Sequence, residues 1–273
     1  MRRWMSATGG DYRWKCRDAV AESATIHTFD DSGHTDMRTL LFIVIQLLAV
    51  ESAVCAPPVA AHVGDTPIAI SAPAGFADPS AASPEMRTVA ETLTPPDNRL
   101  LALFVPEADI KRAASGQSPE LTRYFMAQTS RKAESAKVSA RDFDQFRTTF
   151  TQQQRDAIKS ANDDIQKNLD VASKELGRKF QDSEFAIKAG EIKPLGMFDA
   201  GGSSFGMTAL TNYSGMVDGK KNDVVLAMAT TIALVKGKIV FLYAYSVYKS
   251  NDDVDWTIAQ SRLWLSSIAG LNQ

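Results

Sequence analysis

The sequence predicts an α+β fold, in which a largely antiparallel sheet carries a long central helix and a C-terminal helix packed on it. First, two apolar runs rich in β-branched and aromatic residues flank a tight turn at Lys236-Gly237, which is typical of a β-hairpin. Second, a helical pattern of apolar residues extends over residues 140–180, and a third pattern, over 253–271, predicts the closing helix. A pair of membrane helices is the rival interpretation of the two runs. Each run has only about a dozen residues, however, where a membrane span needs about 20.

The register of the hairpin follows if Val235 pairs with Lys238, because successive side chains of a strand alternate between the two faces of the sheet. One face then carries large residues, in the pairs Leu234/Ile239, Ile232/Phe241, Thr230/Tyr243, Met228/Tyr245 and Leu226/Val247. The other face carries smaller ones, in the pairs Ala233/Val240, Thr231/Leu242, Ala229/Ala244 and Ala227/Ser246. Both faces are largely apolar, so we expect both to be covered, the small-residue face by a closely packed helix.

Residues 37–61 have the layout of a secretory signal peptide, with a positive charge before a short apolar run and small residues after it. Val59-Ala60-Ala61 supplies small residues at both recognition positions of the peptidase, so we expect cleavage between Ala61 and His62. The earlier Val54-Cys55-Ala56 also fits, but Pro57 would follow that cut and should block it. Lipoprotein processing at Cys55 is an alternative, although Val54 occupies a position where a smaller residue is preferred.

Residues 1–36 are polar and aperiodic and precede a signal that works best at a chain terminus. We expect them to be a non-structural extension upstream of a true translation start at Met37. A long cytoplasmic extension is the alternative.

The remaining chain, 62–273, is expected to form a single α+β domain that is periplasmic or secreted and has no transmembrane span. The whole chain has 273 residues, 23% of them charged, and a formal net charge of −2, without the basic excess of nucleic-acid-binding proteins. Both cysteines, Cys16 and Cys55, precede the domain. A domain of about 210 residues buries roughly 70% of its surface, so its apolar core alone is sufficient for folding.

The first half of this domain is predicted to alternate between strands and helices. Strands are expected at 66–71, 99–105 and 121–129. A helix that begins after Ser83-Pro84 should end at Leu93, before Pro95-Pro96. The segment 106–120 is expected to be irregular, with a short helical turn.

The long helix should begin after Ser139, because Asp142 three residues on completes a capping box. Its apolar stripe has steps of about 3.7 residues, which fits a straight α-helix better than a coiled coil. At 1.5 Å per residue the helix would be about 60 Å long, so either it breaks near Lys159–Asp164 or one end projects. We expect the second half of the stripe, Ile165, Leu169, Leu176 and Phe180, in the core. The first half supplies a candidate partner surface, made of Phe143, Phe146 and Phe150.

The second half of the domain is predicted to be a run of strands followed by a helix. Strands at 191–198 and 203–211 precede the hairpin, and Pro194 places the first of them at a sheet edge. The closing helix has acidic residues at its positive end and apolar residues on two sides, so it should lie between the sheet and another element.

This order of elements resembles the PsbP-like α/β/α sandwich. So does the opening 68–76, a strand that runs into a Pro-Ala-Gly-Phe turn. The close, with 242–248 followed by Trp256 and Trp264, is also similar to exported bacterial proteins of unknown function. The resemblance covers most of 62–273 and lies in the order of the elements and their residue composition, without a diagnostic motif. The long helix departs from the compact pattern of that fold. It implies an accessory or assembly role.

Little in the domain points to catalysis. With no cysteine, and with His62 as its one histidine, serine and cysteine triads and most zinc sites are excluded, and we expect no metal or cofactor. Gly201-Gly202-Ser203-Ser204 is interpreted as a turn and Asn251–Asp255 as a helix N-terminus rather than a calcium loop. The tyrosines of the last strand are expected to be core residues or cross-strand pairs rather than pocket walls: Tyr243, Tyr245 and Tyr248.

The sequence therefore predicts an exported, non-enzymatic binding protein, an envelope accessory or assembly factor with a protein partner and no nucleic acid. The alternative is a small-ligand-binding protein with an apolar pocket between sheet and helix. A hydrolase with a Ser–Lys or paired-carboxylate site comes third. An exposed apolar patch above about 400 Å² on the long helix would favour a protein partner. A pocket of about 300 Å³ or more with converging polar groups would favour a ligand.

Overall fold

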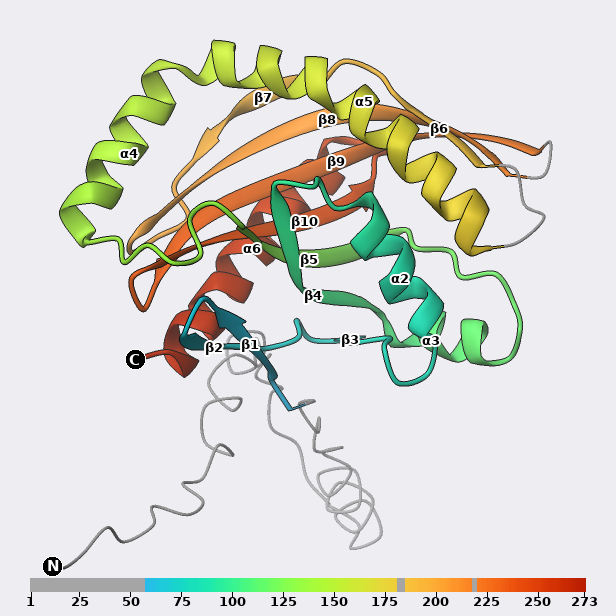
Figure 1. Cartoon of the computed structure of the whole chain (residues 1–273), viewed down its shortest axis with the longest axis horizontal. Coiled ribbons are helices and arrows are strands. Elements are labelled where there is room, and N and C mark those ends of the chain that lie inside the picture. The colour runs from blue at the N-terminus through green and yellow to red at the C-terminus, as the bar shows by residue number, and fades with distance from the viewer. Residues whose placement is uncertain (1–56, 181–184, 218–219) are drawn as a thin grey trace, which may run out of the picture. The chain divides into compact units, whose positions relative to one another are not determined.

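A computed structural model describes residues 57–180, 185–217 and 220–273. These residues belong to one compact unit, Ala56–Gln273, and the element labels used below are those of Figure 1. The predicted extension 1–36 and the apolar run of the predicted leader lie outside the described residues.

The described residues form a mixed α+β fold with a mostly antiparallel sheet and a C-terminal helix, as the sequence predicts. The eight-stranded sheet contains β3 (Phe76–Ala77), β4 (Asn98–Pro106), β5 (Arg123–Ser130), β10 (Lys238–Val247), β9 (Lys220–Val235), β8 (Ser204–Val217) and β6 (Phe185–Ala189) in that order, and β7 (Lys193–Phe198) shares the edge of β8 with β6. A separate hairpin consists of β1 (Val59–Val63) and β2 (Thr66–Ile70). The helices are α2 (Pro84–Leu93), α3 (Glu107–Ala114), α4 (Ala140–Gln152), α5 (Gln154–Lys179) and α6 (Asn251–Leu271).

The central hairpin has the predicted register, with Val235 opposite Lys238 at the turn and Leu226 opposite Val247 at the far end. Its two turn residues, Lys236 and Gly237, have φ angles of 48° and 76°. A two-residue turn with positive φ at both positions matches the right-handed twist of the flanking strands. The prediction of the hairpin, its turn and its faces is confirmed.

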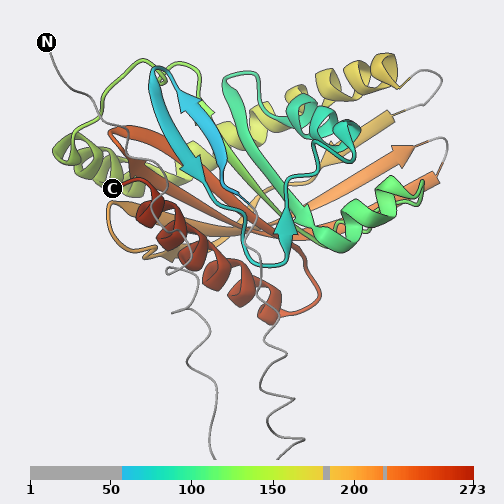
Figure 2. The same ribbon diagram turned by 90° about the horizontal axis from the view of Figure 1, so that it is seen from below.

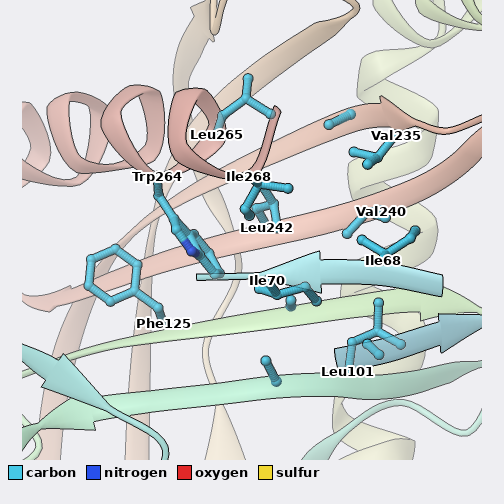
Figure 3. Packing of buried hydrophobic residues seen from close by; sticks show 14 of the residues in the cluster. Ile68, Ile70, Leu101, Phe125, Val235, Val240, Leu242, Trp264, Leu265 and Ile268 are labelled. Atoms are coloured by element: carbon cyan, nitrogen blue, oxygen red, sulfur yellow. The ribbon is translucent and has the colours of Figure 1, made fainter. Parts of the chain in front are cut away.

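Both faces of the sheet are covered, and Figure 2 shows α6 and α5 on opposite sides of it. The small-residue face of the hairpin packs on α6, as predicted, and Figure 3 shows Trp264 and Ile268 between the helix and the strands. Small side chains let a helix approach a sheet closely. This core also includes Ile68 and Ile70 of β2.

Ala229→Leu should lower the free energy of unfolding by about 1–3 kcal/mol, because Ala229 is fully buried on this face and a larger side chain overpacks it. Thr231→Val is the matched control on the same strand and face. The Thr231 hydroxyl is buried and has no hydrogen-bond partner within the described residues, so its removal should be neutral or stabilising. Urea melts give both values, and an unchanged Ala229→Leu protein would show that this face is loosely packed.

The long helical segment is divided into α4 and α5 at Gln153, whose φ and ψ are −101° and 12°. The predicted capping box of Ser139 and Asp142 is present at the start of α4. Of the two expected alternatives, a break near Lys159–Asp164 or a projecting end, the structure shows a break, but it lies earlier, at Gln153, and α5 is continuous through 159–164. Figure 1 shows the two helices as an arch over one side of the sheet.

Helix α5 also protects the edge strand β6, which the sequence analysis missed. Three polar side chains on α5 accept hydrogen bonds from outward-facing backbone N–H groups of β6 and the loop after it. Ser173 accepts from Ile187 at 3.1 Å, Gln166 accepts from Ala189 at 3.1 Å, and Asn162 accepts from Ile192 at 2.9 Å. These bonds block further strand pairing at the edge and hold α5 over β6.

Candidate functional site

The structure places the three phenylalanines of the candidate partner surface around Phe205 of β8. Phe143 is only 1% exposed, and Phe146 and Phe150 are half-buried. Their ring centroids lie 5.3–5.9 Å from that of Phe205. The expectation that this end of the helix overhangs the sheet is therefore corrected, because the bend at Gln153 lets α4 follow the sheet and bury its stripe.

The second half of the stripe, which we expected in the core, is buried only in part. Leu169 and Leu176 are buried, and Ile165 and Phe180 are half-buried. Within the described residues, Val171 is the one large apolar side chain of α4 and α5 that is exposed, at 64%. The long helical segment therefore offers little free apolar surface to a protein partner.

The tyrosines of β10 are packing residues. Tyr245 stacks on Tyr124 of β5, its cross-strand partner, at 4.5 Å, and Tyr243 is stacked 6.1 Å from Tyr245. Burial raises the pKa of Tyr243 to about 12. Tyr248 lies apart and donates a hydrogen bond to Asn251 at 3.2 Å. These contacts confirm the prediction for Tyr243 and Tyr245, whereas Tyr248 lies beyond the end of β10 and has no cross-strand partner in the described register.

The other two predicted features are structural as well. Gly201 and Gly202 have φ angles of 86° and 56°, so they form the turn between β7 and β8. At the start of α6, Ser250 and Asp253 form a capping box. Backbone N–H groups of Lys249 and Ser250 bond the Asp253 carboxylate and lower its pKa.

The strongest candidate site is a cleft of about 560 Å³ between α2, α5 and the start of β4. Figure 1 shows α2 beside the C-terminal half of α5 on the same side of the sheet. One wall is the C-terminal part of α2 with Pro95 and Pro96, and the other is α5 from Asn168 to Lys179. We call this site the α2–α5 cleft. Its volume falls in the range of about 300–1,000 Å³ that is typical of ligand sites.

Charged side chains line the cleft, with four cations against two carboxylates: Arg87, Arg99, Arg131, Lys179, Glu91 and Glu175. Arg87 pairs with Glu91 at 2.8 Å. Lys179 bonds both Glu175, at 2.8 Å, and Thr92, at 3.0 Å, and so connects α5 to α2. Because Arg99 pairs with Glu134, which lies outside the cleft, Arg131 accounts for the excess positive charge of the lining.

Arg99 is held on the wall of the cleft by Glu134, a residue outside it. The guanidinium donates two hydrogen bonds to the Glu134 carboxylate, at 2.7 and 3.1 Å, in a bidentate pair. The hydrogen bond from Arg99 keeps the pKa of Glu134 below its usual value, and burial partly opposes this shift. Arg99 is therefore a fixed positive charge on the wall.

Arg131 is the cation of the cleft that has no ion-pair partner among the described residues. Its Nε donates to the carbonyl of Asn98 at 3.0 Å, and its backbone N–H donates to Asp97 at 2.8 Å, so the base of the side chain is fixed. Its terminal nitrogens have no hydrogen-bond or ion-pair partner among the residues that the structure describes, and neither has the side-chain amide of Asn168. Both side chains line the cleft and are available to a ligand.

Apolar side chains complete the walls. Leu93 of α2, Leu100 of β4 and Val171 and Ala172 of α5 line the cleft beside the two prolines. The cleft therefore combines a cationic end with hydrocarbon surface. It differs from the apolar pocket between sheet and helix that the sequence predicts as an alternative, because charged side chains line it.

The cleft residues escape sequence analysis because they come from separate segments, and each has the spacing of an ordinary solvated side chain. The one local signal is Arg131-Lys132 directly after a strand, which is too common to single out Arg131. Nowhere in the described ranges do three or more His, Cys, Asp or Glu side chains gather closely enough to hold a metal ion. None of the helices in the described part of the chain has the length and continuous hydropathy that a bilayer crossing requires.

Comparisons with family models, with curated proteins and with solved structures find no match for this chain.

Proposed function

We propose that the protein is an exported, non-enzymatic binding protein that holds a small organic anion in the α2–α5 cleft. The observation that carries the proposal is the unpaired end of the Arg131 guanidinium in a cleft of about 560 Å³ with an excess of cations. A guanidinium presents a planar pair of donors that matches a carboxylate or phosphate. The bonds to Asn98 and Asp97 hold Arg131 in place before a ligand arrives, which reduces the entropy cost of binding.

The mixed lining supports a ligand with a charged head and a short hydrocarbon tail. Arg131 and Lys179 would bind the head, and Leu100 and Val171 would contact the tail. The exposure of Val171 supports this assignment, because a tail would remove an otherwise wet apolar side chain from water. Octanoate, which has both a charged head and a hydrocarbon tail, is a suitable probe. Inorganic phosphate carries a negative charge without the tail, and octanol carries the tail without the charge.

Arg131→Gln should weaken octanoate binding by at least about tenfold. A hydrogen bond to a charged group contributes about 1.5–3 kcal/mol, and about 1.4 kcal/mol corresponds to a factor of ten in Kd. Isothermal titration calorimetry measures Kd for the wild type and the variant. Phosphate and octanol should each bind more weakly than octanoate.

Lys132→Gln is the matched control, because Lys132 is adjacent, is 77% exposed and pairs with Asp97 outside the cleft. It removes the same charge and should leave the octanoate Kd within about twofold, as expected when the removed charge lies at an exposed surface site. Absence of binding by all three probes, or equal losses in the two variants, would rule out the proposed site.

The proposal includes a periplasmic or secreted location and a PsbP-like sandwich. The signal-peptide pattern of 37–61 supports the first, and the placement of α6 opposite α2, α4 and α5 supports the second. A protein partner in the envelope ranks second here. The cleft favours the small ligand, and Phe143 belongs to the core.

A further inference from the structure

Strand β1 contains the bond at which the sequence predicts signal-peptide cleavage. It pairs with β2 over five residues, from Val59 opposite Ile70 to Val63 opposite Thr66. Ala61 and Val63 are buried, at 7% and 1% exposure, and Val59 packs against the same core. The residues on both sides of the Ala61–His62 bond therefore belong to the folded domain.

The β1–β2 hairpin is fastened to the last helix by polar contacts along β2. The Asn272 side chain accepts a hydrogen bond from the Ala69 N–H at 3.0 Å and donates one to the Ala69 carbonyl at 2.7 Å. The Trp264 indole N–H donates to the Ser71 carbonyl at 2.7 Å. The side chain of Asn272 thus acts as a strand neighbour for β2.

On the β1 side, Arg99 donates a hydrogen bond to the carbonyl of His62 at 2.6 Å. The hairpin is therefore held by α6 on one side and by β4 on the other. Cleavage after Ala61 would remove three of the five residue pairs of the hairpin. It would also place a new charged amino group at His62, beside the Arg99 guanidinium.

We infer that the leader is cut on the N-terminal side of Val59, so that the exported domain keeps the whole of β1. The small-residue stretch 52–56 after the apolar run is the segment of the sequence left for that cut. The cut must precede Ala56, because Pro57 directly after Ala56 would block cleavage at that bond. This inference rests on the export that the proposed function includes, and it is independent of the proposed ligand.

The test expresses the full chain in a bacterial host that secretes proteins and identifies the N-terminus of the exported product by intact mass and N-terminal sequencing. We expect a terminus at Val59 or earlier. A product that begins at His62, or one that retains the leader, would overturn the inference.

His62→Pro in the full chain is the discriminating variant, because proline directly after the cleaved bond blocks a signal peptidase. His62 is exposed and lies opposite Pro67, which has no N–H to donate across the hairpin. The variant should be processed to the same terminus as the wild type, in an amount within about twofold. Retention of the leader by this variant would place the cut at Ala61–His62. The N-terminus of the product reports the position of the cut even if the variant folds poorly.

Discussion

Phe143→Ala should lower the free energy of unfolding by about 3–5 kcal/mol, the cost typical of removing a large aromatic side chain from a core. Phe143 is 1% exposed, and it contacts Phe146 and Phe205 with ring centroids 6.2 and 5.9 Å away. It joins α4 to β8 in one cluster with Ile232 of β9. Urea denaturation followed by circular dichroism measures the loss.

Gln145→Ala is the control for this variant, because Gln145 is exposed on the same helix and alanine keeps the helical propensity. It should change stability by less than about 0.5 kcal/mol. A similarly small effect of Phe143→Ala would mean that α4 leaves the sheet in solution. The three phenylalanines would then again be available as a partner surface.

Trp264→Ala should have an effect of the same size, about 3–5 kcal/mol. The indole is 1% exposed, lies edge-on to Phe104 and Phe125 at 6.1 and 5.2 Å, and donates its N–H to the carbonyl of Ser71. Its removal opens a cavity between α6 and the sheet and leaves a backbone carbonyl without this donor. Trp264→Phe should recover part of the loss, since it refills most of the volume without the hydrogen bond.

The neighbouring Leu263 supplies the control, because it is 61% exposed on the outer side of α6. Leu263→Ala should cost less than about 0.5 kcal/mol. Thermal melts of the three variants measure the losses of stability, which should be largest for Trp264→Ala, smaller for Trp264→Phe and smallest for Leu263→Ala. Equal losses for Trp264→Ala and Leu263→Ala would contradict the placement of α6 on the sheet.

The sequence predicts most strongly the features that local chemistry determines. The hairpin register follows from the turn at Lys236-Gly237, and the start of α4 follows from the reciprocal bonds of Ser139 and Asp142. Pro194 indicates an edge strand, and among the described strands β7 pairs with β8 alone. In each case the residues that specify the feature are neighbours in the chain.

Features that depend on distant residues were missed or misplaced. Strand β6 is short and half-buried, and its pairing partner and the polar acceptors on α5 lie elsewhere in the chain. The bend at Gln153 has no proline or glycine to mark it. We attribute it to the different supports of the two helices, since α4 packs against Phe205 and α5 is tied to β6.

The α2–α5 cleft also depends on residues that are distant in the chain. Arg131 follows β5, Leu93 ends α2 and Lys179 ends α5, and only the packing of α2 on α5 and β4 brings them to one cleft. The phenylalanine stripe, in contrast, is visible in the sequence, but the partner surface predicted from it was wrong. The stripe has the spacing of a packing face, and Phe143 is buried in the core.

A crystal structure of the protein with octanoate would show whether the α2–α5 cleft binds an organic anion. We expect the octanoate carboxylate at about 2.7–3.1 Å from the terminal nitrogens of Arg131, with Lys179 nearby and the tail against Leu100 and Val171. Octanoate bound elsewhere, with no contact to the terminal nitrogens of Arg131, would show that the α2–α5 cleft is not the anion site.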